Sequence, residues 1–300
     1  MNTTYPQRIK AVEFSTIIYL FVTGILIILN HQQLKAIESH LLIRLLVILF
    51  AGFLIIYNKI KKTGTTFQII RQFWVLPLLG YFYGETDYLN NLLFKENLDS
   101  YFANFEFWLF AIQPAEVFSE IISFDWFAEL MYLGYFSYYL LIIGIPVLTY
   151  IKLGPAKSER IIFIVVNSFY LYYLFFILIP VAGPQFYFKS SLANLPEGYL
   201  FGYLVRSVQV LGEAPTGAFP SSHVSICLML LWLTAKNLKK WLTLVIPITV
   251  LLLFSTVYIK AHYLIDVLAA AIITPFVYCV SKQIYHLFTL KIKPYEPKFT

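Results

Sequence analysis

The sequence predicts an all-α fold, a polytopic membrane bundle of about eight transmembrane helices, from its composition and hydropathy. Hydrophobic residues make up 59% of the chain and charged residues 13%, whereas a soluble domain carries about 25% charged residues. The mean hydropathy is +0.73. The aromatic share of 19%, rich in Tyr, suits helices whose ends lie in interfacial belts. We therefore expect most of the chain to lie in lipid.

The individual spans follow from the length that a bilayer demands. A helix needs roughly 20 apolar residues to cross the hydrocarbon core. On that rule the predicted spans cover residues 12–29, 41–57, 74–84, 126–150, 161–183, 223–235, 241–259 and 264–286. No cleavable signal is expected, because the apolar run after Arg8 and Lys10 lacks a small-residue cleavage site and leads into further spans.

Two longer segments between the spans are too polar to cross lipid. Residues 85–125 are aromatic but interrupted by acidic side chains and Pro114, so they predict an amphipathic segment that rests on the outer membrane surface. Residues 183–222 contain Gly, Pro and Ser turn signals and predict a long loop with functional capacity. The predicted spans thus fall into two helices in 1–60 and the remaining six in 74–286, followed by a tail, 287–300, that is expected in the cytoplasm.

The basic residues predict the orientation. With the N-terminus in the cytoplasm, most of the 22 Lys and Arg lie on the inner side, as the positive-inside rule requires. The remaining six lie on the outer side, namely Lys35, Arg44, Lys95, Lys189, Arg206 and Lys260. We expect a bacterial cytoplasmic membrane with the functional site on the periplasmic or extracellular side.

The same distribution excludes several classes of partner. The formal charge of +6 comes from short clusters between apolar runs, which argues against a nucleic-acid partner. The two cysteines, Cys227 and Cys279, both lie in apolar stretches, so neither a disulfide framework nor a metal site is expected. No cofactor is predicted.

Three polar segments fall at the outer ends of predicted spans and are expected to share one site. They are Gly183-Pro184-Gln185, Phe219-Pro220-Ser221-Ser222-His223 and Lys260-Ala261-His262-Tyr263-Leu264-Ile265-Asp266. His262 and Asp266 are spaced i, i+4 at the start of a predicted helix, which places them on one face. The carboxylate would accept the ring N–H and leave the other nitrogen free as a nucleophile or base.

His223 supplies a second imidazole at the start of another span. It follows a Pro-Ser-Ser turn, where free backbone N–H groups and the positive end of a helix favour a phosphate. Ser221 and Ser222 would add hydroxyl donors. A second imidazole that faces the first would protonate a leaving oxygen, since an unperturbed pKa of about 6.5 suits both roles.

These segments resemble the three motifs of the type-2 phosphatidic acid phosphatase superfamily, K-x6-R-P, P-S-G-H and S-R-x5-H-x3-D. The second motif is present as Pro220-Ser221-Ser222-His223, and the third as Ser255-Thr256, five residues, His262, three residues and Asp266. The first is the weakest match, because residues 179–185 contain neither its Lys nor its Arg. Thr256-Val257-Tyr258 before His262-Tyr263 is similar to the inositol phosphorylceramide synthase-like branch.

The resemblance covers residues 74–286 and implies a six-helix catalytic core there, with two additional N-terminal spans in 1–60. It also assigns roles. His262 would be the nucleophile that takes the phosphoryl group, Asp266 its orienting partner and His223 the acid for the leaving group. Ser221, Ser222 and Gln185 would hold phosphate oxygens. Lys260, Lys189 and Arg206 are the outer cations available in place of the motif cations, and Lys260 is preferred because it adjoins the histidine motif.

The leading hypothesis is therefore an enzyme, a lipid phosphatase or phosphotransferase with a phosphohistidine intermediate and no metal requirement. Its substrate would be a membrane lipid phosphate or a phospholipid headgroup, and its acceptor water, inositol, a sugar or another headgroup alcohol. The alternative is a lipid flippase or transporter with a degenerate phosphatase site, although no repeat typical of transporters is seen. A scaffolding membrane protein with a decayed site is a third reading.

Overall fold

The computed structural model describes residues 9–61, 63–188 and 195–291. Within these ranges the chain forms helices and no β-strand, which confirms the predicted all-α class. The helices are α1 (Ala11–Leu29), α2 (Ile37–Ile60), α3 (Thr65–Phe73), α4 (Leu78–Leu89), α5 (Asp99–Phe110), α6 (Pro114–Ile121), α7 (Asp125–Leu153), α8 (Pro155–Leu178), α9 (Pro184–Tyr187), α10 (Leu200–Gly212), α11 (Ser222–Asn237), α12 (Leu242–Tyr258) and α13 (Leu264–Lys291), with the 3-10 turn η2 (Lys239–Trp241) before α12.

Among the described residues, six helices are long and apolar enough to cross a membrane: α1, α2, α7, α8, α12 together with η2, and α13. The other two predicted spans correspond to α4, with 12 residues, and α11, with 16 residues. At 1.5 Å per residue these helices are about 18 and 24 Å long, short of the ~30 Å hydrocarbon core. The multi-pass architecture is confirmed, and the count of eight stays a prediction.

Helix boundaries follow local chemistry. Helix α7 ends at Leu153, and Gly154 follows it with a φ of 86°, a conformation that glycine adopts readily at the end of a helix. Helix α8 then begins with Pro155, which is favoured at the first position of a helix. Helix α8 ends at Leu178, earlier than the predicted 183, because Pro180 cannot continue the ladder of backbone hydrogen bonds. Helix α13 continues through the first residues of the predicted tail 287–300, of which 292–300 lie outside the described residues.

Helix α8 is the centre of the bundle. Every residue from 161 to 170 is buried, as expected for a helix that is apolar on all sides. Asn167 on this helix accepts a hydrogen bond from Ser15 Oγ at 2.7 Å and donates one to Ser281 Oγ at 3.0 Å. These bonds connect α8 to α1 and α13, so the N-terminal helix is attached to the rest of the bundle by polar contacts as well as by packing.

A buried ion pair fastens the hairpin of α1 and α2 to α4. Arg44 donates to both carboxylate oxygens of Glu85, at 2.6 and 2.7 Å, and to Thr23 Oγ1 at 3.1 Å. Both charged side chains are buried, and such a pair is costly to break because one charge would remain without compensation. Glu85 belongs to the segment expected on the membrane surface, and its role in the structure is internal.

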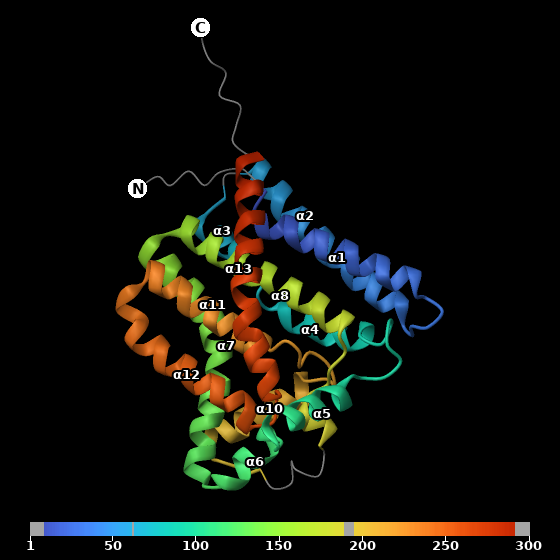
Figure 1. The fold of residues 1–300 in the computed structure, drawn as a ribbon. Coiled ribbons are helices and arrows are strands. Elements are labelled where there is room, and N and C mark those ends of the chain that lie inside the picture. Colours follow the sequence, from blue (N-terminus) through green and yellow to red (C-terminus); the bar gives the residue numbers. More distant parts are fainter. Residues whose placement is uncertain (1–8, 62, 189–194, 292–300) are drawn as a thin grey trace.

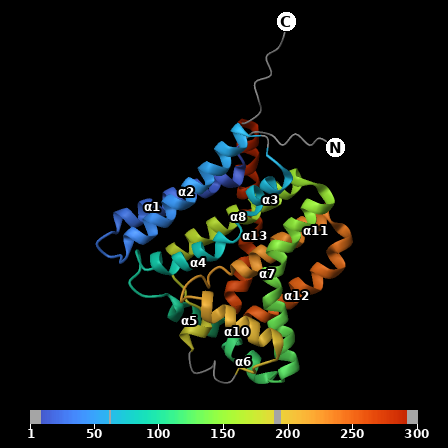
Figure 2. The ribbon, with the colours of Figure 1, turned by 180° about the vertical axis from the view of Figure 1, so that it is seen from behind.

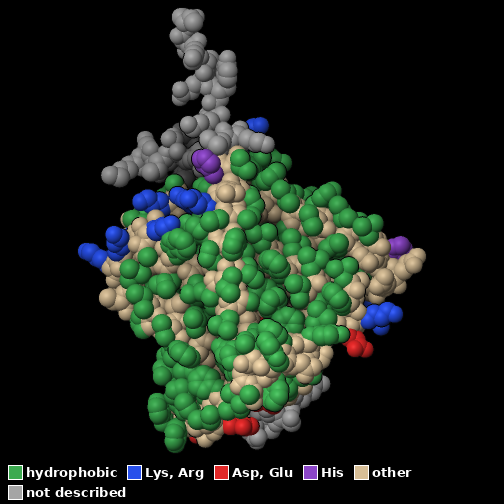
Figure 3. Space-filling view, viewed as in Figure 1, with side chains coloured by type: hydrophobic (Ala, Val, Ile, Leu, Met, Phe, Trp, Pro, Cys, Tyr) green, Lys and Arg blue, Asp and Glu red, His purple; other side chains and the backbone are tan. Residues whose placement is uncertain are grey.

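The ends of the bundle differ in character. Figures 1 and 2 show the start of α1 and the end of α13 at one end, while α5, α6 and α10 gather at the opposite end. In Figure 3 most of the visible Lys and Arg lie over the half near the start of α1, and the visible Asp and Glu lie in the other half. The residues of the predicted site lie at the end formed by α5, α6 and α10.

Candidate active site

The three polar segments predicted to share a site lie side by side, joined by backbone hydrogen bonds. The N–H of Ala218 donates to the carbonyl oxygen of Val181 at 3.0 Å, and the N–H of Gln185 donates to that of Lys260 at 2.9 Å. The N–H of Ser221 donates to the carbonyl oxygen of Asp266 at 3.3 Å. Each segment is therefore fixed to at least one other without any side-chain contribution.

Gly183 permits the closest of these approaches. Its φ is 103°, and a Cβ at this position would lie 2.9 Å from the carbonyl oxygen of Ala261. Only glycine adopts this conformation without strain and leaves room for the backbone at Ala261. The loop that carries Gln185 can consequently lie directly against the segment that carries His262.

His262 precedes α13 instead of lying on it, because the helix begins at Leu264. Its Nδ1 lies 2.8 Å from the carbonyl oxygen of Ala218 and 3.7 Å from Asp266 Oδ2. The ring N–H is thus accepted by Ala218 and not, as the sequence predicted, by Asp266. Since a carbonyl oxygen can only accept, Nδ1 carries the proton and Nε2 keeps its lone pair. Burial lowers the pKa of His262 to about 4, so the ring is neutral at pH 7.

His223 faces this free nitrogen. Its Nδ1 lies 3.1 Å from His262 Nε2, and it occupies the second position of α11. Two tyrosine rings of α7 hold the imidazole, with Tyr135 stacked at 4.7 Å and Tyr138 at 4.3 Å between ring centroids. The two predicted histidines therefore contact each other through His223 Nδ1 and His262 Nε2, and the tyrosine rings fix the orientation of His223.

Asp266 acts on the backbone that carries His262. It is fully buried, and its Oδ2 accepts the N–H of Tyr263 at 2.8 Å, which is the backward half of a capping box. Its other oxygen has no hydrogen-bond partner among the described residues. Asp266 fixes the turn between His262 and α13, and it remains the nearest carboxylate to the ring, at 3.7 Å.

Two further buried acids, both on α5, bind backbone N–H groups in the segments next to the histidine pair. Asp99 accepts the N–H groups of Ala182 and Gly183, each at 2.8 Å. Glu106 Oε1 accepts the N–H of Ile265 at 3.2 Å. Burial raises the pKa of Asp99, and burial together with the charge of Asp266 raises the pKa of Glu106 to about 7.

Asp99 and Glu106 were not among the predicted site residues, because residues 85–125 were expected to rest on the membrane surface. The exposed faces of α5 and α6 do carry Tyr101, Phe105, Trp108 and Ile121, as a surface segment should. The available signal was the spacing of Asp99 and Glu106, seven residues apart and therefore on one helix face. Two acids on one face of a helix whose other face carries aromatic residues indicate that the acidic face packs against polar groups of the protein.

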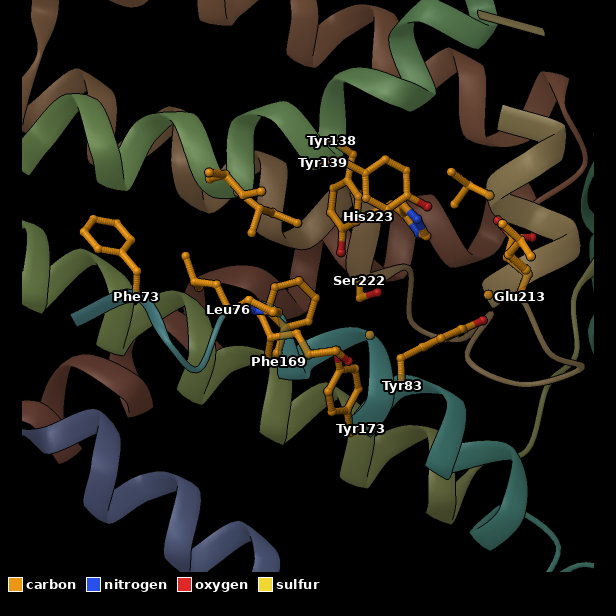
Figure 4. Close-up of a pocket in the computed structure, with 18 residues that line it drawn as sticks. Phe73, Leu76, Tyr83, Tyr138, Tyr139, Phe169, Tyr173, Glu213, Ser222 and His223 are labelled. Atoms are coloured by element: carbon orange, nitrogen blue, oxygen red, sulfur yellow. The ribbon is translucent and has the colours of Figure 1, made fainter. Parts of the chain in front are cut away.

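A cavity of about 630 Å³ opens beside His223 and Ser222. Tyr83, Tyr138, Tyr139, Phe169 and Tyr173 line its middle. Figure 4 shows Phe73 and Leu76 toward one end, His223 and Ser222 in the centre and Glu213 at the other end. A cavity with an apolar end and a polar end suits an amphiphile better than a small polar metabolite.

The predicted phosphate-binding side chains have different surroundings. Ser222 lines the cavity, whereas Ser221 is buried as the N-cap of α11 and accepts the N–H of Val224 at 3.3 Å. Gln185 donates to Glu213 Oε2 at 2.5 Å and accepts from Gln209 Nε2 at 3.1 Å. Ser222 is therefore the member of this group that faces the cavity with His223.

The predicted cations have contacts away from the histidine pair. The ammonium group of Lys260 donates to the carbonyl oxygens of Ala115 at 3.0 Å and Glu116 at 3.4 Å. The guanidinium group of Arg206 lies 5.6 Å from the centre of the Tyr132 ring. Lys189 lies outside the described residues. Where the family motif has Arg, Thr256 donates to the carbonyl oxygen of Leu253 at 2.9 Å.

Comparison with known proteins gives two matches. The model of the PAP2 superfamily matches residues 104–280. A PA-phosphatase related-family protein of Dictyostelium discoideum is 26% identical over 132 residues, which cover 42% of this chain and 24% of that protein. The matched part is thus about a quarter of the length of this curated relative. No solved structure matches.

The raised pKa of Glu106 predicts a dependence of stability on pH. In the folded protein its carboxyl group stays protonated up to about pH 7, whereas in the unfolded chain it ionises near pH 4.5. Its contribution to stability is therefore complete at low pH and is lost as the pH rises through 7. The difference in unfolding temperature between Glu106→Gln and the wild type should therefore increase, in favour of the variant, from pH 5 to about pH 8.

Unfolding temperatures of the purified protein across this pH range provide the measurement. Glu96→Gln is the matched control, because Glu96 is exposed just before the same helix. A difference between Glu106→Gln and wild type that stays constant with pH would contradict the prediction.

Proposed function

Because the chain belongs to the PAP2 superfamily, we propose that it is a membrane-embedded lipid phosphatase or phosphotransferase that works through a phosphohistidine intermediate. Membership indicates a phosphatase-like, lipid-related function in a membrane protein. The observation that carries the finer proposal is the 3.1 Å contact between His223 Nδ1 and His262 Nε2 at the wall of a largely aromatic and aliphatic cavity.

The protonation of His262 supports its role as the nucleophile. Ala218 holds the proton on Nδ1, so the lone pair on Nε2 points toward the cavity side where His223 lies. Attack on phosphorus forms the P–N bond and breaks the P–O bond to the leaving alcohol, and protonated His223 gives its proton to that oxygen. An acceptor oxygen then attacks phosphorus, which forms the new P–O bond and breaks the P–N bond to His262, and the acceptor proton returns to His223.

His262 is only 2% exposed, and His223 rather than His262 lines the cavity. The phosphoryl group therefore has to enter between the two rings and replace their mutual hydrogen bond. We propose that Ser222 and the free N–H groups at the start of α11 receive its oxygens, with Ser221 and Gln185 supporting that turn and loop. Lys260, Lys189 and Arg206 remain the candidate cations of the same end of the bundle.

The acceptor determines the reaction class. Water makes the protein a phosphatase, and a polyol such as inositol or another headgroup alcohol makes it a transferase, as the resemblance of residues 256–266 to inositolphosphotransferases suggests. We propose that the site opens to the outer face of a bacterial cytoplasmic membrane, because the basic residues favour the opposite side. The core would comprise residues 74–286, with 1–60 as an accessory helix pair.

Replacement of His262 tests the mechanism. Purified protein in nanodiscs is incubated with labelled phosphatidate, isoprenyl phosphates and phospholipids, with and without inositol. His262→Ala should lower headgroup release or transfer by at least about 10³-fold, because it removes the group that forms the covalent bond. His223→Ala should slow the chemical step by about 10²–10⁴-fold, as expected for loss of a general acid.

Mass spectrometry of enzyme quenched during turnover should locate the label on His262 in the wild type. His286→Ala is a matched control, since His286 lies near the far end of α13. Full activity of His262→Ala, or label on His223, would overturn the assignment. Transport of lipid without headgroup loss would instead indicate a flippase.

Asp99 provides a second test, since it holds the loop that carries Gln185. Removing its carboxylate in Asp99→Ala leaves the buried N–H groups of Ala182 and Gly183 without their acceptor, at a cost of about 1–3 kcal/mol each. We expect a lower unfolding temperature and at least a tenfold loss of lipid turnover. The same loss in Ser100→Ala, the exposed neighbour, would show that the effect is not specific to Asp99.

A further inference from the structure

Glu213 gives the polar end of the cavity an unusual charge. It is half-buried at the end of α10, and the described residues that line the cavity include this carboxylate but no Lys or Arg. A site built for a phosphate dianion alone would place positive charge in this position. The charge at this end of the cavity instead favours a cation.

The hydrogen bonds of Glu213 do not neutralise it. Its Oε1 accepts the hydroxyl of Tyr135 at 2.7 Å, and its Oε2 accepts the amide of Gln185 at 2.5 Å. Both donors are neutral, so they fix the position of the carboxylate and leave its formal charge in place. Since Tyr135 also stacks on His223, a single tyrosine connects the charged end of the cavity to the histidine pair.

Aromatic rings line the cavity between Glu213 and its apolar end. Tyr83, Tyr138, Tyr139 and Tyr173 all line the cavity, and Figure 4 shows Tyr83, Tyr138 and Tyr139 between Glu213 and the apolar end. Aromatic faces attract alkylammonium groups, and aromatic cages are the usual way in which proteins bind quaternary ammonium ligands. A carboxylate next to such rings adds direct charge complementarity.

The order of groups along the cavity matches the order of groups in one class of lipid. Apolar side chains at Phe73 and Leu76 occupy one end, the histidine and Ser222 the middle, and Glu213 the other end (Figure 4). A zwitterionic phospholipid presents acyl chains, a phosphodiester and an ammonium group in the same sequence. A phosphatidate would instead bring a second negative charge toward Glu213, which like-charge repulsion disfavours.

We propose that Glu213 and the tyrosines beside it form a subsite for an alkylammonium headgroup, so that the substrate is a zwitterionic phospholipid of the phosphocholine type. This inference rests on the proposed function and specifies its substrate class. Polyol headgroups fit less well, because they carry no positive charge to complement Glu213 and gain no cation–aromatic attraction from the tyrosine rings.

The arrangement also defines which bond breaks. With the ammonium group held at Glu213, the headgroup stays on phosphorus and the glyceride oxygen leaves. The P–N bond to His262 forms, the P–O bond to diacylglycerol breaks, and the proton of His223 passes to the glyceride oxygen. Water or an alcohol then attacks phosphorus, the P–N bond breaks and the acceptor proton returns to His223, which releases phosphocholine or its ester.

Binding and turnover test the subsite separately. Full-length protein in a maltoside detergent is titrated calorimetrically with glycerophosphocholine, glycerophosphoethanolamine, glycerophosphoinositol and glycerol phosphate. Wild type should bind glycerophosphocholine about tenfold more tightly than the inositol and phosphate probes, the scale of one good cation–aromatic contact. Glu213→Gln should abolish this preference, whereas Glu38→Gln, at an exposed acid on α2, should retain it.

Tyr139→Phe and Tyr139→Leu provide a second pair that does not alter charge. The Phe variant keeps the aromatic face and should keep the preference, while the Leu variant should lose it. Equal binding of all probes, tighter binding of the inositol or phosphate probe, or an equal loss for every probe in Glu213→Gln would overturn the inference.

Lipid turnover distinguishes failure of the inference from failure of the proposed function. Phosphatidylcholine should be cleaved at least about tenfold faster than phosphatidate or phosphatidylinositol, and His262→Ala should abolish the reaction. His262-dependent cleavage without this preference overturns the headgroup subsite and retains the function. Binding of glycerophosphocholine that requires Glu213, without cleavage of any lipid, retains the subsite and overturns the function.

Discussion

The hydrogen bond from the His262 ring to the carbonyl oxygen of Ala218 determines the geometry of the whole site. It sets the tautomer, and the tautomer decides which nitrogen keeps a lone pair for chemistry. Ala218 can provide this acceptor because its own N–H is bound to Val181, in the loop that follows α8. The orientation of one imidazole therefore depends on backbone from two segments that are distant in sequence, and on α8, the most buried helix of the bundle.

The acids buried beside the histidine pair are the second constraint on this site. Asp99, Glu106 and Asp266 are buried at its back and bind backbone N–H groups, so their function is to hold loops and not to attract anions. In the proposed mechanism the positive potential beside His223 then comes mainly from the N-terminus of α11, because the described residues that line the cavity include no Lys or Arg. Such a site provides less positive charge than a pair of arginines, which suits a phosphodiester with one negative charge better than a monoester with two.

Sequence patterns predicted the helical class, most spans and the convergence of three segments, because hydrophobic length and loop charge act locally. They did not predict the partner of the His262 ring, since Ala218 is 44 residues away and contributes a backbone atom that any residue carries. The roles of Asp99 and Glu106 were missed for a related reason. Acids in an aromatic segment suit a membrane surface as well as a buried position, and only the structure shows which backbone N–H groups they bind. Helices α4 and α11 also run past the ends predicted at 84 and 235, to Leu89 and Asn237, because the polar residues there do not interrupt a helix.

Shielding of the histidines bears on the choice between hydrolysis and transfer. His262 is 2% exposed, α5 and α6 cover that end of the bundle (Figure 1), and the cavity beside His223 is lined mainly by aromatic and aliphatic side chains. The covalent intermediate that we propose would be protected from bulk water in such surroundings. An acceptor that reaches it through the cavity must be compatible with an apolar path, and an alcohol attached to a lipid meets that condition better than water does. If His262 is the nucleophile that we propose, the burial that keeps its ring neutral thus favours transfer to a membrane alcohol over hydrolysis.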